Sequence, residues 1–282
     1  MSADTNHLNA RAVAAWTTAC LVVVLATTNP VYKTLVLAAA LAALVAGAGF
    51  RRTRRLFAAA VLIAAFAVVL NLVSAHLGAT VLFTLPAQLP AIGGPYTLEA
   101  LAYGATGGIT VAAAILAAAP FSLLLAPHEV MDALPAALSR TGAALAAALN
   151  LVPAVGATFV QVSEAQRMRG WRPRGPRSWA EVAVPIVLTS VESSIQLAES
   201  MEARGFCSGP RTHMSPVRMS SQSWVLVVAS GSAVALFTLS IAAGWVGPWA
   251  PYPLLTAPPI DPRPLLACLL LFTPALQWRS RS

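Results

Sequence analysis

Long runs of apolar residues alternate with short polar connections along most of this chain. The runs are Ala12–Thr28, Thr34–Phe50, Leu56–Ala75, Leu98–Leu125 and Trp224–Val246, with a shorter sixth at Leu265–Trp278. A helix needs roughly 20 mostly apolar residues to cross about 30 Å of hydrocarbon. The pattern therefore predicts an all-α membrane protein with five transmembrane helices and a sixth candidate near the C-terminus.

Residues 128–222 follow a different pattern, because charged residues of both signs are interleaved there with apolar ones. Helices are expected over Ala143–Arg169, with a bend at Pro153, and over Trp179–Arg204. The second carries an apolar stripe flanked by acidic and amide side chains, which is typical of an amphipathic helix. The predicted division is membrane helices 1–4 in residues 1–127, a cytosolic insert of amphipathic helices in 128–222, and the C-terminal membrane helix or helices in 223–282.

Composition agrees with lipid as the solvent. The chain has 282 residues, of which 57% are hydrophobic and 10% charged, and its mean hydropathy is +0.72. Soluble domains carry about a quarter charged residues, so a single water-soluble core and a disordered chain are both excluded. The three cysteines, Cys20, Cys207 and Cys268, are widely spaced and suggest neither a disulfide framework nor a zinc site.

The distribution of positive charge predicts the orientation. Arg51, Arg52, Arg54 and Arg55 lie between the second and third runs, and such clusters stay on the cytoplasmic side. The N-terminus, the insert and the C-terminal tail are then cytoplasmic as well, and of the basic residues only Lys33 and Arg263 lie outside. The net charge of +8 thus has a cause in topology, and no nucleic-acid partner is expected.

The fourth run begins after a connection rich in proline and glycine. From Leu85 to Thr97 the sequence favours an irregular loop outside the hydrocarbon. Thr97 is suited to cap the following helix, and Glu99 lies in its first turn, where the helix dipole favours an anion. Further along that helix, Gly104, Gly107 and Gly108 favour close packing against another helix.

An internal repeat marks the ends of the two helices in the insert. Val160–Trp171 and Ile195–Phe206 align at an offset of 35 residues, with four identities: Gln161/Gln196, Glu164/Glu199, Arg169/Arg204 and Gly170/Gly205. Glycine at such a position ends a helix in the left-handed conformation, and arginine suits the last turn. The repeat is either a good helix terminator used twice, or a pair of guanidinium groups beside Trp171 and Phe206 that dock into two acidic grooves of a cytosolic partner.

These segments resemble the paired Ala-Arg-Gly motifs of the transmembrane T component of energy-coupling factor (ECF) transporters, the CbiQ/EcfT-like family. Asn29–Lys33 is similar to the Pro-x-x-Lys element of that family, and the resemblance covers roughly residues 25–206. Ala203-Arg204-Gly205 matches the motif completely, whereas the first copy reads Met168-Arg169-Gly170.

The resemblance implies a coupling subunit of an ECF-type ABC importer for a vitamin or metal ion, in the plasma membrane of a prokaryote. Its implied partners are two cytosolic ATPase subunits and a small membrane subunit that captures the substrate, the S subunit. Docking to the ATPases would involve Met168, Arg169, Gly170, Ala203, Arg204 and Gly205, supported by Glu164, Glu199, Trp171 and Phe206. The sequence has no Gly-x-x-x-x-Gly-Lys-Ser/Thr phosphate loop, so ATP hydrolysis is expected from the partners, and neither catalytic residues nor a metal or cofactor are expected in this chain.

Two other functions stay open at this stage. One is the permease of another ABC transporter, which usually carries its coupling helix in a single short loop, so the doubled motif argues against it. The other is an intramembrane enzyme using Asn71, His76 and Glu99, or using His128 and Asp132 as metal ligands four residues apart. Two ligands without a third are weak grounds for a metal site.

Overall fold

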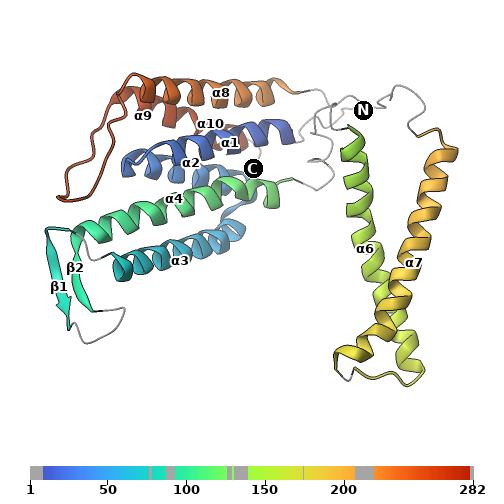
Figure 1. Ribbon diagram of the computed structural model, residues 1–282. Helices are drawn as coiled ribbons and strands as arrows, with labels where there is room; N and C mark the ends of the chain where they lie inside the picture. The colour runs from blue at the N-terminus through green and yellow to red at the C-terminus, as the bar shows by residue number, and fades with distance from the viewer. Residues whose placement is uncertain are drawn as a thin grey trace. The chain divides into compact units, whose positions relative to one another are not determined.

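The chain forms two compact units. The computed structural model describes residues 9–75, 78–86, 93–125, 129, 139–173, 175–206 and 219–279. One unit comprises Met1–Ala133 with Met219–Ser282 and is called here the membrane unit; the other, Leu134–Arg218, is called the helical hairpin (Figure 1). The helical hairpin is thus an insertion in the chain of the membrane unit.

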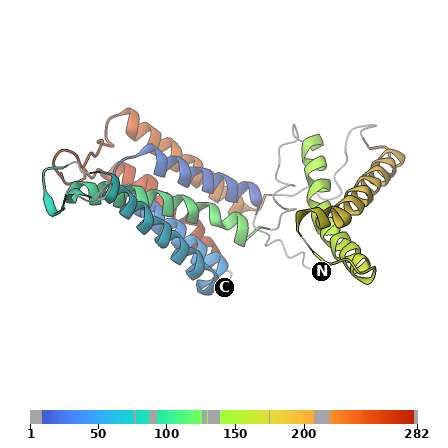
Figure 2. The same cartoon turned by 60° about the horizontal axis from the view of Figure 1, so that its bottom comes forward.

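Five helices form most of the membrane unit: α1 Ala10–Ala26, α2 Pro30–Ala48, α3 Phe50–Ser74, α4 Leu98–Leu123 and α8 Ser221–Ala242. Across the unit their order is α8, α1, α4, α3, and α2 packs against α4 (Figures 1 and 2). Polar side chains begin four of them, since Asn9, Asn29, Thr97 and Ser220 each accept a hydrogen bond from a backbone N–H of the first turn. The predicted all-α membrane fold and the cap at Thr97 are confirmed.

Five described helices are long and apolar enough to cross a membrane. They are Pro30–Ala48, Phe50–Ser74, Leu98–Pro120, Ser178–Ala203 and Ser221–Ala242, while Ala10–Ala26 is a shorter apolar helix. The first predicted span is therefore the short one, and Ser178–Ala203 belongs to the insert that the sequence pattern predicts as amphipathic. That helix carries four glutamates, Glu181, Glu192, Glu199 and Glu202, and a charged side chain at the bilayer centre costs about 2.5–3.5 kcal/mol.

Two glycines bring α3 and α4 into close contact. A Cβ added at Gly108 would lie 2.8 Å from the Ala64 carbonyl oxygen, and one added at Gly104 would lie 3.2 Å from the Val68 Cα. The spacing of four places both glycines on one face of α4, as in membrane helix pairs with small interfacial residues. A Cβ at Gly107 would meet no described atom within 4 Å, so the predicted close packing is not seen at that glycine among the described residues.

The sixth apolar run crosses the membrane unit as a broken helix, α9 Pro262–Leu270 and α10 Thr273–Arg279. Near the start of α2, the Asp261 backbone N–H donates to the Tyr32 hydroxyl at 3.0 Å. Near the end of α2, a Cβ added at Gly47 would lie 2.8 Å from the Trp278 ring. The two short helices thus follow α2 from one end to the other.

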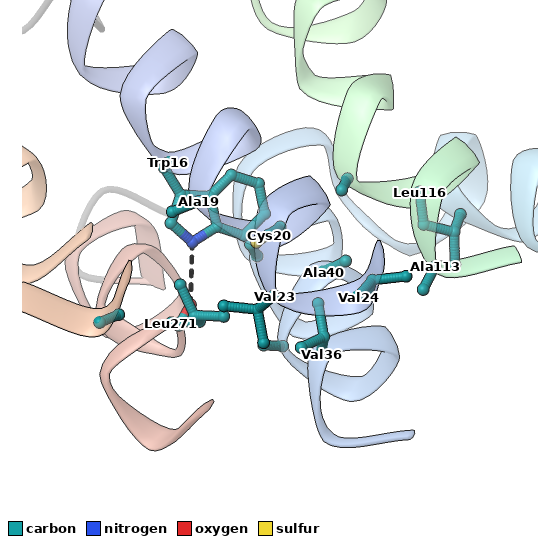
Figure 3. Packing of buried hydrophobic residues seen from close by; sticks show 14 of the residues in the cluster. Trp16, Ala19, Cys20, Val23, Val24, Val36, Ala40, Ala113, Leu116 and Leu271 are labelled. Atoms are coloured by element: carbon teal, nitrogen blue, oxygen red, sulfur yellow. Dashed lines mark hydrogen bonds between the residues drawn. The ribbon is translucent and has the colours of Figure 1, made fainter. Parts of the chain in front are cut away.

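At the break between α9 and α10, the last helices of the chain meet the first. The indole N–H of Trp16 in α1 donates to the Leu271 carbonyl oxygen at 2.9 Å (Figure 3). Both residues are fully buried in the same apolar cluster. A carbonyl freed by the helix break is thereby satisfied within the apolar interior.

A short antiparallel hairpin connects α3 to α4. It consists of β1 Val81–Leu85 and β2 Gly94–Thr97, paired from Val81↔Thr97 to Leu85↔Gly94. The irregular loop predicted from Leu85 to Thr97 is therefore wrong at its two ends, because Leu85 and Gly94–Thr97 belong to strands. The Glu99 carboxylate fixes the base of the hairpin, since both of its oxygens accept from the Thr80 backbone N–H, at 3.0 and 3.2 Å.

Candidate functional site

The helical hairpin consists of two long antiparallel helices, α6 Ser139–Met168 and α7 Pro176–Ala203. They hold 30 and 28 residues, which corresponds to about 45 and 42 Å. The first copy of the repeat ends in the turn between them, at the lower end of the pair in Figure 1, and the second copy ends at the other end of α7. The two tips are therefore separated by the length of α7.

Both copies of the repeat end their helix with the same hydrogen bonds. Trp171 N–H donates to the Gln166 carbonyl and Gly170 N–H to the Arg167 carbonyl, at 2.9 and 3.0 Å. In the second copy, Phe206 N–H donates to Met201 and Gly205 N–H to Glu202, both at 2.9 Å. With φ of 88° at Gly170 and 72° at Gly205, each tip is a Schellman motif that requires the left-handed glycine.

Each tip exposes the arginine of its Arg-Gly pair. Arg169 and Arg204 immediately precede the terminating glycines, and both are exposed. Among the described residues neither guanidinium group has a hydrogen-bond or ion-pair partner. Two equivalent cations, held on rigid helix ends about 40 Å apart, are available for two separate anionic sites.

The apolar residues beside the two arginines are arranged differently. At the first tip Met168 is 85% exposed, whereas Trp171 is only 8% exposed and folds back onto the hairpin. The Trp171 indole donates to the Ser178 carbonyl at 2.8 Å and packs edge-on against Trp179. At the second tip Phe206 remains 44% exposed. The apolar side chain nearest the arginine thus precedes it in one tip and follows it in the other.

The glutamates of the repeat are not brought to the arginines. Glu164 and Glu199 are exposed and precede Arg169 and Arg204 by five residues, which places each glutamate about 140° around the helix from its arginine. The spacing alone could have shown this.

A proline in α7 opens a contact that sequence reasoning missed. Pro185 has no N–H, so the carbonyl of Glu181, four residues earlier, loses its helical donor. The side-chain amide of Gln166 in α6 donates to that carbonyl at 3.4 Å. The arrangement weakens α7 at one point and links that point to the end of α6. The proline was a usable signal, but the position of Gln166 depends on the packing of the two helices.

An apolar groove with a volume of about 460 Å³ runs along the hairpin. Val155 of α6 lines it together with Ile186, Val187, Ser190, Val191, Ser194, Ile195 and Ala198 of α7. Ser190, Ser194 and Ala198 recur every four residues, and such small side chains let a second helix approach closely in a membrane. The recurrence is visible in the sequence, but that Val155 of α6 completes the groove depends on the packing of the two helices.

The element at Asn29–Lys33 joins three parts of the membrane unit. The Asn29 side chain caps α2 through Val31 and donates to the Pro259 carbonyl at 2.7 Å. Lys33, almost buried, donates to the Thr110 hydroxyl of α4 at 2.7 Å. These contacts hold the start of α2 against α4 and against the connection that precedes α9.

The residues considered for catalysis do not form a described site. Glu99 holds the base of the β1–β2 hairpin, and the buried Asn71 oxygen lies in the α3–α4 contact and has no hydrogen-bond partner among the described residues. His76, His128 and Asp132 lie outside the described residues. Within the part of the chain that the structure describes, no group of three or more His, Cys, Asp or Glu residues could hold a metal ion.

Comparison with known proteins decides the family. The family model described as CbiQ, cobalt transport protein, matches residues 3–214. The chain belongs to the CbiQ family. The match includes α1 to α4, both tips and the whole described hairpin. No curated protein matches the chain.

Membership in the CbiQ family has direct consequences. The protein is a multi-pass membrane component of the cobalt and ECF type of transporter, and the family implies partners of the ABC type. A transport component is consistent with a protein that is not itself an enzyme.

Proposed function

We propose that this CbiQ-family protein is the T component of an ECF-type importer, which transmits movement from two cytosolic ATPases to an S subunit that captures a vitamin or metal ion. The observation that carries the proposal is the pair of matching Schellman tips, each of which projects an arginine that has no partner among the residues that the structure describes. Glycine alone is sufficient to end a helix in this way, so helix termination does not explain why both copies place an exposed arginine before the glycine.

Each tip docks into one ATPase. Arg169 and Arg204 bind acidic groups there, since a guanidinium forms two parallel hydrogen bonds with a carboxylate. Gly170 and Gly205 shape the tips, and the small Ala203 leaves the second arginine accessible. Met168 and Phe206 supply the apolar contact at their respective tips, while Trp171 supports the first tip from within the hairpin.

α7 transmits the movement, because it connects the two tips directly. Trp171 and Gln166 attach the first tip to the beginning of α7, and the second tip is its C-terminal end. When ATP brings the two ATPases together, the tips must change their distance or their angle. Bending at Pro185, where α7 lacks a helical hydrogen bond, accommodates this change.

The apolar groove beside Pro185 receives a helix of the S subunit. Its lining is uncharged, and the small residues Ser190, Ser194 and Ala198 permit close helix packing. Bending of α7 would displace this bound helix and reorient the S subunit. The T component itself requires no cofactor in this scheme, and the transported substrate is selected by the S subunit.

The proposal places both tips in the cytoplasm of a prokaryotic cell. The arginine cluster at the beginning of α3 supports this orientation through the positive-inside rule. Cysteines introduced for Gly93 and Met168, each combined with Cys207→Ser, test it in intact cells with a membrane-impermeant thiol reagent. Gly93→Cys should react from outside, and Met168→Cys only after the membrane is permeabilised. The reverse pattern, or a Met168→Cys that stays unreactive in open membranes, would contradict the orientation.

The docking test compares arginines of different position. Arg169→Ala and Arg204→Ala should each weaken association with the ATPases about 10- to 100-fold, because each removes charged hydrogen bonds worth about 1.5–3 kcal/mol. Arg172→Ala, which changes an exposed arginine three residues after Arg169, is the matched control and should bind normally. Binding is measured by co-purification and titration in detergent. Equal behaviour of all three variants would refute docking through the tips.

A further inference from the structure

The β1–β2 hairpin presents apolar side chains on a structure too small to bury them. Val81, Leu82 and Phe83 are each about half exposed, and the Phe83 ring stacks on Tyr96 with the centroids 4.7 Å apart. Leu82 is an extra residue on β1, because Val81 pairs with Thr97 while Phe83 pairs with Tyr96. From Leu56 to Leu98 the sequence contains no Asp, Glu, Lys or Arg. A two-stranded hairpin of this composition is marginally stable in water and prone to aggregate.

The hairpin is fixed to the end of two membrane helices. Only residues 75–80 separate the end of α3 from β1, and β2 leads directly into α4. Glu99, in the first turn of α4, binds the Thr80 N–H, and the Leu98 N–H donates to the Thr80 carbonyl at 3.0 Å. In Figure 1 both strands run crosswise to α3 and α4. The strands therefore follow the plane of a membrane that these helices cross.

Aromatic residues mark the same end of the membrane unit as an interface. Tyr103 of α4 lies against Tyr252 with the ring centroids 5.8 Å apart, and the Arg263 guanidinium lies 3.9 Å above the Trp245 ring. Tyr103 and Trp245 are both partly exposed. Tyrosine and tryptophan accumulate at the level of the lipid headgroups, where an apolar ring and a polar tip are both accommodated.

We propose that the β1–β2 hairpin lies in the headgroup layer of the bilayer and anchors the α3–α4 end of the protein to lipid. Water would leave Val81, Leu82 and Phe83 exposed, and the hydrocarbon core would leave the outer strand edges without hydrogen bonds. The boundary between headgroups and acyl chains satisfies both the apolar side chains and the strand edges. This boundary layer also adjoins the exposed apolar surface of α3, a helix in which only Thr53 and Ala60 are buried.

Depth-dependent fluorescence quenching tests the anchor in the full-length protein. Phe83→Cys and Leu82→Cys, each combined with Cys207→Ser, are labelled with the environment-sensitive dye NBD and reconstituted into phosphatidylcholine vesicles. Two positions are used because loss of the Phe83 ring removes its stacking on Tyr96. Met168→Cys in the same background is the control for a water-exposed position, since that side chain is 85% exposed.

Both hairpin labels should emit at shorter wavelength than the Met168 label. Iodide in the water should quench them several-fold less, and lipids with a spin label near the headgroup should quench them more than lipids labelled deep in the acyl chain. Quenching by iodide equal to that at Met168 would overturn the anchor. Protection from both iodide and the lipid quenchers would also overturn the anchor, because protein would then cover the β1–β2 hairpin. Strongest quenching by the lipid labelled deep in the acyl chain would overturn it as well.

Discussion

Replacing Gly108 by alanine should separate α3 from α4 and destabilise the membrane unit. The new Cβ would lie 2.8 Å from the Ala64 carbonyl oxygen and 3.3 Å from the Ala64 Cα. Since ordinary contact begins near 3.4 Å, α3 must retreat by about 0.6 Å, a gap that forfeits a quarter to a half of each van der Waals contact it affects. The close contacts are with backbone atoms, so a change of rotamer cannot relieve them. Overpacking of this kind costs about 1–3 kcal/mol.

The neighbouring glycine provides the control for this prediction. Gly107→Ala makes the same chemical change one residue earlier in α4, where a Cβ would meet nothing within 4 Å. Both variants gain the roughly 1 kcal/mol by which alanine favours a helix over glycine, so the difference between them isolates the clash. Unfolding of both proteins in lipid–detergent bicelles, titrated with sodium dodecyl sulfate and followed by circular dichroism, gives the two free energies. Equal stabilities would show that α3 does not approach α4 at Gly108.

Two further predictions concern the helical hairpin. Trp171→Phe keeps a ring against Trp179 but removes the hydrogen bond to the Ser178 carbonyl, so it should lower the free energy of unfolding by about 1 kcal/mol. Trp171→Ala should lower the free energy of unfolding further. If thermal denaturation shows Trp171→Ala to be the more stable of the two variants, Trp171 is not buried against the hairpin. Pro185→Ala restores the helical bond to the Glu181 carbonyl and should stabilise α7 by about 1–3 kcal/mol. The same variant should bind the ATPases normally but transport more slowly, and unchanged transport in reconstituted vesicles would argue against bending at Pro185.

Features set by neighbouring residues could be predicted from the sequence. The helices of the membrane unit could be predicted from the apolar runs, because a membrane span depends mainly on length and composition. The start of α4 could be predicted from Thr97, and the ends of α6 and α7 from the two Arg-Gly pairs, because helix caps depend on a few consecutive residues. The candidate site residues Arg169 and Arg204 could be picked out for the same reason, because their repeat consists of two short segments; their role in docking stays a prediction.

Features set by distant contacts could not be predicted in this way. Gly107 and Gly108 are adjacent in the sequence, yet only Gly108 faces α3, and that depends on how α4 is rotated. The strand β1 is fixed by Glu99, which lies beyond the opposite strand. Trp171 and Phe206 occupy the same place in the repeat, but only Trp171 has Ser178 and Trp179 within reach to fold against. Sequence spacing left the two aromatic residues equivalent, and packing distinguished them.

The bond between Trp16 and Leu271 joins residues that lie 255 positions apart in the chain. While the segment between them is being synthesised, α1 has neither α8 nor the break between α9 and α10 to pack against. The helical hairpin is made during this interval, before the membrane unit can assemble fully. A nascent chain that stops before residue 271 therefore leaves the indole without its acceptor, and quality-control proteases could recognise such a chain by its incompletely packed first helix.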